Sequence, residues 1–293
     1  MKTSREYCPA CQYRSFYDCL KQLRLSPEEE ERLIRWYLKE AAERFDFTLT
    51  PGKNHFYSRP IHEYAGYDFY AGQKRKDNEE MLRYEEHAKK AVLAAKNGLE
   101  AAVRYAIAGN VIDPTAHHDI TVEQALDAAA QKPLAIDDVE LLRAALQKAR
   151  SVLYVTDNCG ELVFDKVFLW AMDALGLAPL SKFTVAVRGG PFANDAMMDD
   201  AAQVGLTEMV KVITTGSDLC TVYLPDMGEE FMEAYRACDL LIAKGMGNYE
   251  SVESFADKTV CMLLMAKCVP VANNLGARIG DFVCRVKNAE LMR

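Results

Sequence analysis

The sequence predicts an α/β protein in which a parallel sheet is covered by helices and preceded by a mainly helical region. Beyond Ser151, short aliphatic and β-branched runs alternate with stretches of helical length, and this alternation is typical of a parallel sheet. Before that point, the chain has helical periodicity instead. We therefore expect a helical N-terminal domain over residues 1–105 and an α/β core over residues 106–293, with some N-terminal helices covering the sheet.

The composition is that of an ordinary globular protein of one or two domains. The 293 residues are 50% hydrophobic and 27% charged, and their formal net charge is −8. This acidic balance argues against nucleic acid as a partner, because phosphate backbones require clustered lysine and arginine. No apolar run approaches the ~18 residues that a membrane span needs, so no membrane partner is expected. The sequence does not define an oligomeric state.

The elements of the N-terminal half follow from periodicity and capping residues. A helix is predicted over residues 27–45, where Ser26 is a suitable N-cap and acidic residues occupy the first turn. The segment 48–75 is rich in proline, glycine and aromatic residues, so a loop-rich connection is expected. One long helix is expected from Asp77 to Ala108, because this stretch is rich in Ala, Glu and Lys and lacks proline. Shorter helices are predicted at residues 121–131 and 137–149.

The C-terminal half alternates between predicted strands and helices. Strands are predicted within residues 151–158, 183–190, 210–216 and 239–248, where polar residues or glycines follow each strand, with further β candidates at 259–268 and 282–286. Helices are predicted at residues 161–176, 194–205 and 229–238. In an open α/β sheet, ligands bind outside the carboxyl ends of the parallel strands. The residues that follow each strand are therefore the candidates for chemistry.

Oxygen-bearing side chains follow the first two of these strands. Asp157 and Asn158 come after the first strand, and Asp195 follows the second. Parallel strands end at the same edge of a sheet, and Mg²⁺ and Mn²⁺ prefer carboxylate and amide oxygens as ligands. The pattern therefore predicts a divalent metal site. The plainer interpretation is that these residues form turns and a helix N-cap.

A lysine and a glycine-containing segment follow the fourth strand. Lys244 is a cation at the strand end, and the backbone amides of Gly245, Gly247 and Asn248 are suited to phosphate oxygens in front of a helix N-terminus. Arg188, after the second strand, is a further candidate for substrate binding, although it could equally pair with a surface acid. Neither GxxxxGK[ST] nor GxGxxG occurs here, so the usual nucleotide-binding signatures are absent. A tight turn is the plainer interpretation of the glycines.

Together, these blocks resemble the metal-dependent damage-control phosphatases, a family long known only as a domain of unknown function. The resemblance is carried by residues 157–165, 187–196 and 239–250, together with residues 108–113, which occur in the family's order. The family includes a protein once described as an acidic-residue carboxyl methyltransferase. The Arg-Thr-x-Lys motif of that eukaryotic subgroup has no counterpart in the matching stretch here, residues 267–272.

The resemblance implies a Rossmann-like three-layer α/β/α core and a divalent metal, Mg, Mn, Co or Ni, held by the three oxygen-bearing residues named above. It places the substrate phosphate near residues 239–245, with Asp239 and Lys244 as contacts. Asn110, at the end of the predicted long helix, is a further substrate-binding candidate, although it could equally be a helix C-cap residue.

The predicted activity is hydrolysis of phosphomonoesters of small metabolites, such as sugar phosphates or damaged phosphometabolites, by metal-activated water. Lys244 would stabilise charge on the phosphate, and Glu161 or Asp157 would act as the base. Attack by Asp157 itself is the alternative chemistry. Two other functions are open: an S-adenosylmethionine-dependent carboxyl methyltransferase, whose glycine-rich loop is absent here, and a non-catalytic phosphometabolite-binding protein.

Nine cysteines are scattered along the chain, and free thiols in a reducing compartment explain this odd number better than a disulfide framework. Because the N-terminus has no apolar leader, we expect a cytoplasmic protein. Cys8 and Cys11 form a Cys-x-x-Cys pair that is similar to the mainly prokaryotic subgroup of the family. The pair could be half of a zinc site, but two thiols packed against the first helix fit the sequence better.

Overall fold

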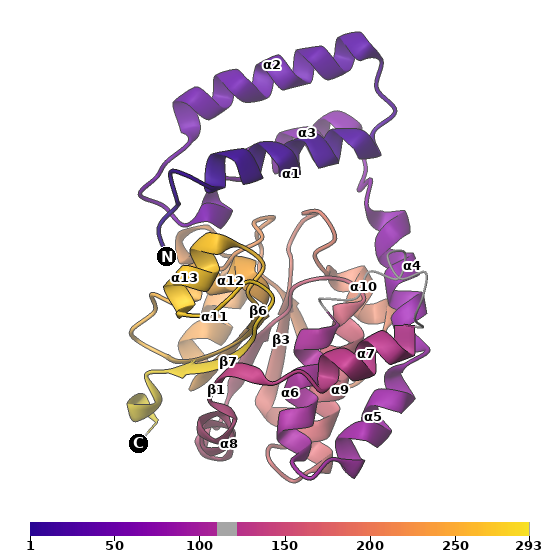
Figure 1. Cartoon of the computed structure of the whole chain (residues 1–293), viewed down its shortest axis with the longest axis vertical. Coiled ribbons are helices and arrows are strands. Elements are labelled where there is room, and N and C mark those ends of the chain that lie inside the picture. Colours follow the sequence, from indigo (N-terminus) through magenta and orange to yellow (C-terminus); the bar gives the residue numbers. More distant parts are fainter. Residues whose placement is uncertain (110–121, 293) are drawn as a thin grey trace.

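A computed structural model describes residues 1–109 and 122–292 of the chain (Figure 1). Its centre is one seven-stranded sheet with the strand order β1-β7-β6-β5-β2-β3-β4. Five neighbouring strands, β6, β5, β2, β3 and β4, are parallel to one another. Strand β7 pairs antiparallel with β6, and β1 pairs parallel with β7. The strands are β1 (Leu134–Asp137), β2 (Val152–Val155), β3 (Phe183–Val187), β4 (Lys211–Thr214), β5 (Leu240–Lys244), β6 (Thr259–Met265) and β7 (Phe282–Lys287).

The strands from β2 to β7 lie where the sequence predicts strands, but the sheet is not entirely parallel. Backbone hydrogen bonds from Ala266 to Asp281 (2.9 Å) and from Gly280 to Ala266 (2.7 Å) close the connection between β6 and β7 at one edge. Strand β7 therefore runs back antiparallel beside β6, without a crossover to a parallel position. The edge strand β1 is not predicted, because its residues are half-buried or exposed and form no long apolar run.

Helices cover both faces of the sheet, because successive strand residues point to opposite faces. Along β2, Val152 and Tyr154 belong to one apolar cluster, and Leu153 and Val155 belong to the other. This arrangement confirms the predicted three-layer α/β/α core. The first layer contains α5 (Glu85–Ala94), α6 (Gly98–Ala108), α7 (Val122–Ala130), α8 (Val139–Lys148), α9 (Glu161–Ala174) and α10 (Met198–Gln203). The second layer contains α11 (Glu229–Ala237), α12 (Gly245–Val252) and α13 (Val269–Leu275).

The stretch that was expected to be one long helix forms α4 (Ala71–Leu82), α5 and α6 instead. The chain is extended at Ala95, and the side chain of Asn97 accepts a hydrogen bond from the Glu100 N–H at 3.3 Å, which caps α6. Because of this break, α5 and α6 can both pack against α9, while α4 contacts α9 and α10. These N-terminal helices therefore contribute to the cover of the sheet.

The preceding helices pack around an aromatic core of their own. In it, the rings of Phe16 and Tyr37 stack with 4.3 Å between their centroids. The predicted cap at Ser26 is confirmed, because Ser26 and Glu29 exchange hydrogen bonds at the start of the second helix. This region consists of α1 (Cys8–Gln22), α2 (Pro27–Arg44), the short 3-10 helix η1 (Pro51–Asn54) and α3 (Ser58–Ala65).

The N-terminal helices lie above the edge of the sheet from which α12 and α13 begin (Figure 1). Helix η1 contacts α12, and the Gly52 N–H donates to the Glu250 carboxylate at 3.0 Å. The region is thus fixed near the carboxyl ends of the parallel strands. Within residues 1–109 and 122–292, no helix is long and apolar enough to cross a membrane.

Candidate functional site

Two loops at the carboxyl edge of the sheet lie side by side and bring the predicted metal ligands together. The loop after β2 contains Asp157 and Asn158, and the loop after β3 contains Asp195. An antiparallel bridge joins Asn158 to Asp195, and the Ala196 N–H donates to the Asp157 carbonyl oxygen at 2.8 Å. Backbone pairing therefore holds these three residues next to one another.

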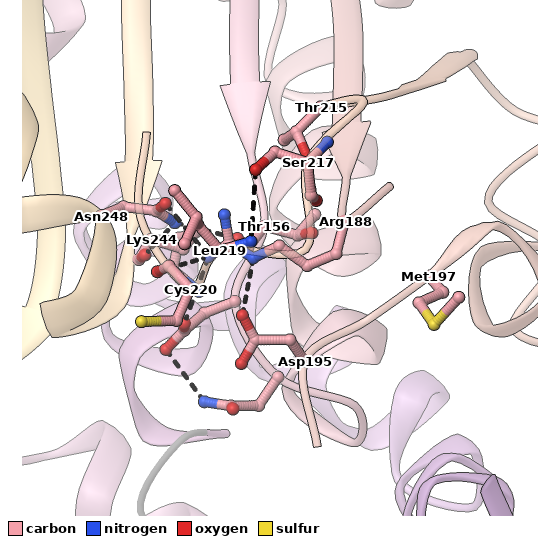
Figure 2. A network of polar contacts seen from close by, with 12 residues as sticks. Thr156, Arg188, Asp195, Met197, Thr215, Ser217, Leu219, Cys220, Lys244 and Asn248 are labelled. Carbon is pink, nitrogen blue, oxygen red and sulfur yellow. Dashed lines mark hydrogen bonds and ion pairs between the residues drawn. The ribbon is translucent and has the colours of Figure 1, made fainter. Parts of the chain in front are cut away.

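Arg188 lies at the centre of this edge, and only 1% of it is exposed (Figure 2). Its Nε donates to Asp195 Oδ2 at 2.6 Å, and its Nη2 donates to the Cys220 carbonyl oxygen at 2.9 Å and to Asn248 Oδ1 at 3.1 Å. Asp157 Oδ1 lies 3.9 Å from Nη2. Nη1 is buried and has no hydrogen-bond partner in the described part of the chain. One arginine thus links the loops after β2, β3 and β4 to α12.

The charged groups at this edge shift one another's pKa values. Burial raises the pKa of Asp195 to about 6, although the Arg188 guanidinium lowers it, and the Asp157 carboxylate raises it further. Burial alone would lower the pKa of Arg188, but the two carboxylates outweigh burial and raise it. Two buried carboxylates therefore face one buried guanidinium, which leaves an excess of negative charge.

Gly245 and Gly247 are required by close packing at the start of α12. Gly245 has a φ of +74°, which favours glycine, and a Cβ at this position would overlap the Asp157 carboxylate. A Cβ on Gly247 would overlap the Cys220 carbonyl oxygen. Both glycines lie in the first turn of a helix and not in the loop that the sequence suggested. The helix start is therefore pressed against the predicted ligand Asp157.

Lys244 lies inside the protein between two acidic side chains. Its Nζ forms ion pairs with Glu161 and with Asp165, the latter at 2.5 Å, and it donates to the Ala106 carbonyl oxygen at 2.7 Å. An ammonium group has three donors, so these partners account for all of them. The structure thus corrects the expectation that Lys244 contacts the substrate phosphate. Lys244 instead ties the end of β5 to α6 and α9.

Two carboxylates share one ammonium group in this cluster, and all three side chains are fully buried. Burial raises the pKa of Glu161 to about 8, although Lys244 lowers it, and burial also raises the pKa of Asp165. In the described part of the chain, Glu161 Oε2 and Asp165 Oδ2 have no hydrogen-bond partner. Glu161 begins α9 directly after the loop that holds Asp157, so a carboxyl group that titrates near neutral pH stands at the site.

Asp165 was not among the predicted site residues. It lies one turn after Glu161 on α9, and the Tyr154 hydroxyl group donates to it at 2.7 Å. The signal was available in the sequence, because two acids four residues apart lie in a mostly apolar helix beside Phe164 and Phe168. Buried acids in such a helix require a charged partner.

One predicted substrate contact, Asp239, is not brought to this edge. Asp239 directly precedes β5, at the opposite end of that strand from Lys244, and it accepts a hydrogen bond from the Arg150 backbone N–H at 2.8 Å. The structure therefore removes Asp239 from the candidate site. Asn110 lies outside the described residues.

In the ranges that the structure describes, no group of three or more His, Cys, Asp or Glu side chains is arranged to hold a metal ion. The three candidate metal ligands at the carboxyl edge do not form such a group, because they are two carboxylates, Asp157 and Asp195, and the side-chain amide of Asn158. Cys8 is buried at the start of α1 and Cys11 is exposed, and the described residues do not complete a zinc site around them.

The fold is an α/β fold whose parallel strands end at one edge, which is the edge where open α/β sheets commonly bind ligands. Oxygen donors suited to a cation lie there beside a buried guanidinium and a helix start suited to an anion. Residues 4–283 match the damage-control phosphatase ARMT1-like domain, and the chain belongs to this family. The membership that the sequence blocks suggested is confirmed.

Several archaeal proteins are similar over most of the chain. An uncharacterized protein of Methanocaldococcus jannaschii is 32% identical over 289 residues, which cover 94% of this chain and 93% of that protein. A damage-control phosphatase of Pyrococcus horikoshii is 36% identical over 211 residues, which cover 70% and 72%. A damage-control phosphatase of Archaeoglobus fulgidus is 29% identical over 288 residues, which cover 95% and 97%.

The structure is also similar to a crystal structure of a DUF89 family protein from Pyrococcus horikoshii. The TM-score is 0.88 at 29% identity, and the match covers 97% of this chain and 98% of that one. The family and its named relatives favour a phosphatase over a methyltransferase and over a non-catalytic binding protein.

The close approach of Gly245 to Asp157 leads to a first prediction. Gly245→Ala is expected to lower phosphatase activity, measured with p-nitrophenyl phosphate, because the new methyl group displaces the Asp157 carboxylate. Gly276→Ala is the matched control, since Gly276 has a similar φ of +71° but no atom within 4 Å of the new Cβ. Both variants should lose about 1–2 kcal/mol of stability through backbone strain. Equal activities in the two variants would contradict the assignment of the Asp157 carboxylate to the active site.

The Glu161 cluster leads to a prediction about pH. The raised pKa of Glu161 means that its ionisation is less favourable in the folded than in the unfolded protein, so stability falls as pH rises toward and through about 8. Glu161→Gln removes this loss, and its Tm at about pH 9 should exceed that of the wild type, by roughly 2–4 °C per kcal/mol. The exposed Glu140→Gln is the control. A wild-type Tm that falls no more steeply with pH than the Glu161→Gln Tm would refute the expectation.

Proposed function

We propose that this chain is a metal-dependent phosphatase that hydrolyses phosphate monoesters of small metabolites at the carboxyl edge of its sheet. One observation carries the proposal: the bridge between the Asp157–Asn158 loop and the Asp195 loop, which holds three oxygen donors next to one another, with the two carboxylates beside Arg188. Membership of the damage-control phosphatase ARMT1-like family supports the reaction type.

The donor set fits a divalent cation. Asp157, Asn158 and Asp195 offer carboxylate and amide oxygens, which hard cations prefer. The carboxylates outnumber the Arg188 guanidinium; burial raises the pKa of Asp195, and repulsion from Asp157 raises it further. When bound, a divalent cation supplies Lewis-acid stabilisation and lowers the pKa of a water molecule. The proposed cation is Mg²⁺, Mn²⁺, Co²⁺ or Ni²⁺.

We assign the substrate phosphate to Arg188 and the start of α12. The buried Nη1 of Arg188 has no partner in the described residues, and an anion would satisfy it. The backbone amides of Gly245, Gly247 and Asn248 lie at the start of α12, where an anion is favoured. Lys244 supports this arrangement indirectly, because it holds Glu161 in place.

Glu161 is the proposed proton acceptor. Its carboxyl group is buried, its pKa is raised to about 8, and it begins α9 next to the loop that holds Asp157. A group that titrates near the working pH is suited to take a proton from the attacking water. Direct attack by Asp157 is the alternative, and it would leave an aspartyl phosphate that rapid acid quenching can trap.

A cavity near the site supports a small polar substrate. Its volume is about 620 Å³, and it lies between the N-terminal helices and the loop after β4, with Arg59, Asp218 and His55 in its lining. His55 Nδ1 lies 3.6 Å from Cys220 Sγ, and the carbonyl group of Cys220 accepts the hydrogen bond from Arg188. This volume is in the usual range of small-molecule sites. We therefore propose a small phosphorylated metabolite as the substrate.

The metal assignment is tested by two isosteric variants. Asp157→Asn and Asp195→Asn each remove one negative charge. Loss of a group that only orients a metal ligand typically costs about 10–100-fold. Loss of a ligand itself should therefore lower metal-dependent hydrolysis of p-nitrophenyl phosphate by more than this factor. The assay is run with Mg²⁺, Mn²⁺, Co²⁺ and Ni²⁺ in turn. Asp199→Asn is the matched control, because Asp199 is exposed and lies four residues from Asp195.

Wild-type turnover in either ligand variant would overturn the metal assignment. Activity that survives complete removal of divalent cations would overturn the metal dependence as a whole. The same assay on a panel of sugar phosphates and other phosphometabolites, ranked by kcat/KM, identifies the substrate class. No phosphate release from any of them with any of the four metals would contradict the proposed function.

A further inference from the structure

Helix α4 contacts the core through polar side chains, which is unusual for a helix that packs against a protein interior. Its buried residues are Lys74, Asn78 and Met81. Burial of an amide or an ammonium group costs free energy unless partners satisfy it. Apolar side chains of similar size would serve packing alone equally well. The two buried polar residues therefore indicate a role other than stability.

Asn78 has 0% exposure and contacts the loop after β2 and helix α10, which follows the loop that holds Asp195. Its Oδ1 accepts a hydrogen bond from the Gly160 N–H at 2.7 Å, and Gly160 ends the loop after β2. Its Nδ2 donates to Gln203 Oε1 at 2.9 Å and to Asp200 Oδ1 at 3.4 Å. Both acceptors lie on α10, which continues the loop after β3. One side chain thus joins the two loops from the side of α4.

The contact on α10 is itself fixed. Asp200 Oδ2 accepts a hydrogen bond from the Met197 N–H at 2.9 Å, which holds the start of α10. Lys74 lies one turn before Asn78, and its Nζ is 2.9 Å from Asp68 and 3.9 Å from Asp200 Oδ2. Asn78 therefore contacts an α10 residue, Asp200, that is itself held in place by hydrogen bonding.

We propose that Asn78 is a positioning residue for the metal site. It sets the spacing between the loop with Asp157 and Asn158 and the loop with Asp195, so that the ligand oxygens are in place before a cation arrives. An amide suits this task, because one side chain must accept from Gly160 and donate to α10. Groups that orient metal ligands commonly contribute about 10–100-fold to metal affinity. The inference rests on the proposed function, since it assumes that these loops bind a divalent cation.

The test is a binding measurement that needs no turnover. Titration calorimetry gives the Kd for Mn²⁺ of the wild type, of Asn78→Leu and of Gln73→Leu. Asn78→Leu keeps the size and removes every hydrogen bond, so its Kd should rise by about 10–100-fold. Gln73→Leu is the matched control on the same helix, because Gln73 is exposed and bonds to Asp77 within α4 at 2.7 Å. Its Kd should equal that of the wild type.

A double variant separates orientation from packing. Asn78→Asp combined with Asp200→Asn exchanges the donor and the acceptor across the contact and leaves the net charge unchanged. The carboxylate at position 78 still accepts from Gly160, and the amide at position 200 can donate back to it. This pair should recover part of the Mn²⁺ affinity that Asn78→Leu loses, because the contacts with Gly160 and position 200 return while the contact with Gln203 Oε1 does not. Failure to recover it, in a folded protein, would contradict a role that depends on these hydrogen bonds.

Each result has a distinct meaning. A folded Asn78→Leu variant that binds Mn²⁺ as tightly as the wild type overturns the role of Asn78 and leaves the metal site intact. A wild-type protein that binds no Mn²⁺ overturns the metal site in the proposed function instead. If Asn78→Leu does not fold, Gln203→Leu decides the question, because it removes the shorter of the two Asn78 contacts with α10 at a half-buried position, together with the bond from Gln203 to the Arg75 carbonyl oxygen. An unchanged Kd in that variant would also overturn the inference.

Discussion

The buried ion pair between Arg188 and Asp195 is the interaction on which the candidate site depends. A guanidinium group inside a protein is tolerated only when its charge is paired and its N–H groups are bonded. The partners of Arg188 come from its own loop, from the Cys220 carbonyl group after β4 and from Asn248 on α12. Satisfying this one side chain therefore brings together segments that are distant in sequence. The nitrogen that remains without a partner lies where an anion would complete the set.

The site contains two clusters with the same imbalance of charge. Asp157 and Asp195 face Arg188, and in the second cluster Glu161 and Asp165 face Lys244. In each case two buried carboxylates share one cation, so burial raises carboxyl pKa values that the cation only partly lowers. A protein selected for stability alone would not keep such an arrangement, and perturbed pKa values of this kind are common at functional sites.

The N-terminal helices are part of the site and not only a cover for it. Helix η1 contacts α12, and α4 contacts α9 and α10, the helices that follow the loops after β2 and β3 (Figure 1). Two of the three buried side chains of α4 are polar, in contrast to the apolar packing of α6 against α9. Polar contacts are directional, so they define the position of a loop more closely than apolar contacts do.

The sequence by itself determined the strands from β2 to β7 and the residues at their carboxyl ends, because buried strands are apolar runs and the polar residues after them mark one edge. Asp157, Asn158 and Asp195 could be found in this way. Only the tertiary structure decided where Lys244 points: Ala243 faces the layer of α12, so alternation along β5 turns Lys244 toward α6 and α9. The break at Asn97 and the contacts of Asn78 also depend on neighbours distant in the chain. Local periodicity holds no information about such neighbours, because side-chain partners are set by packing between elements.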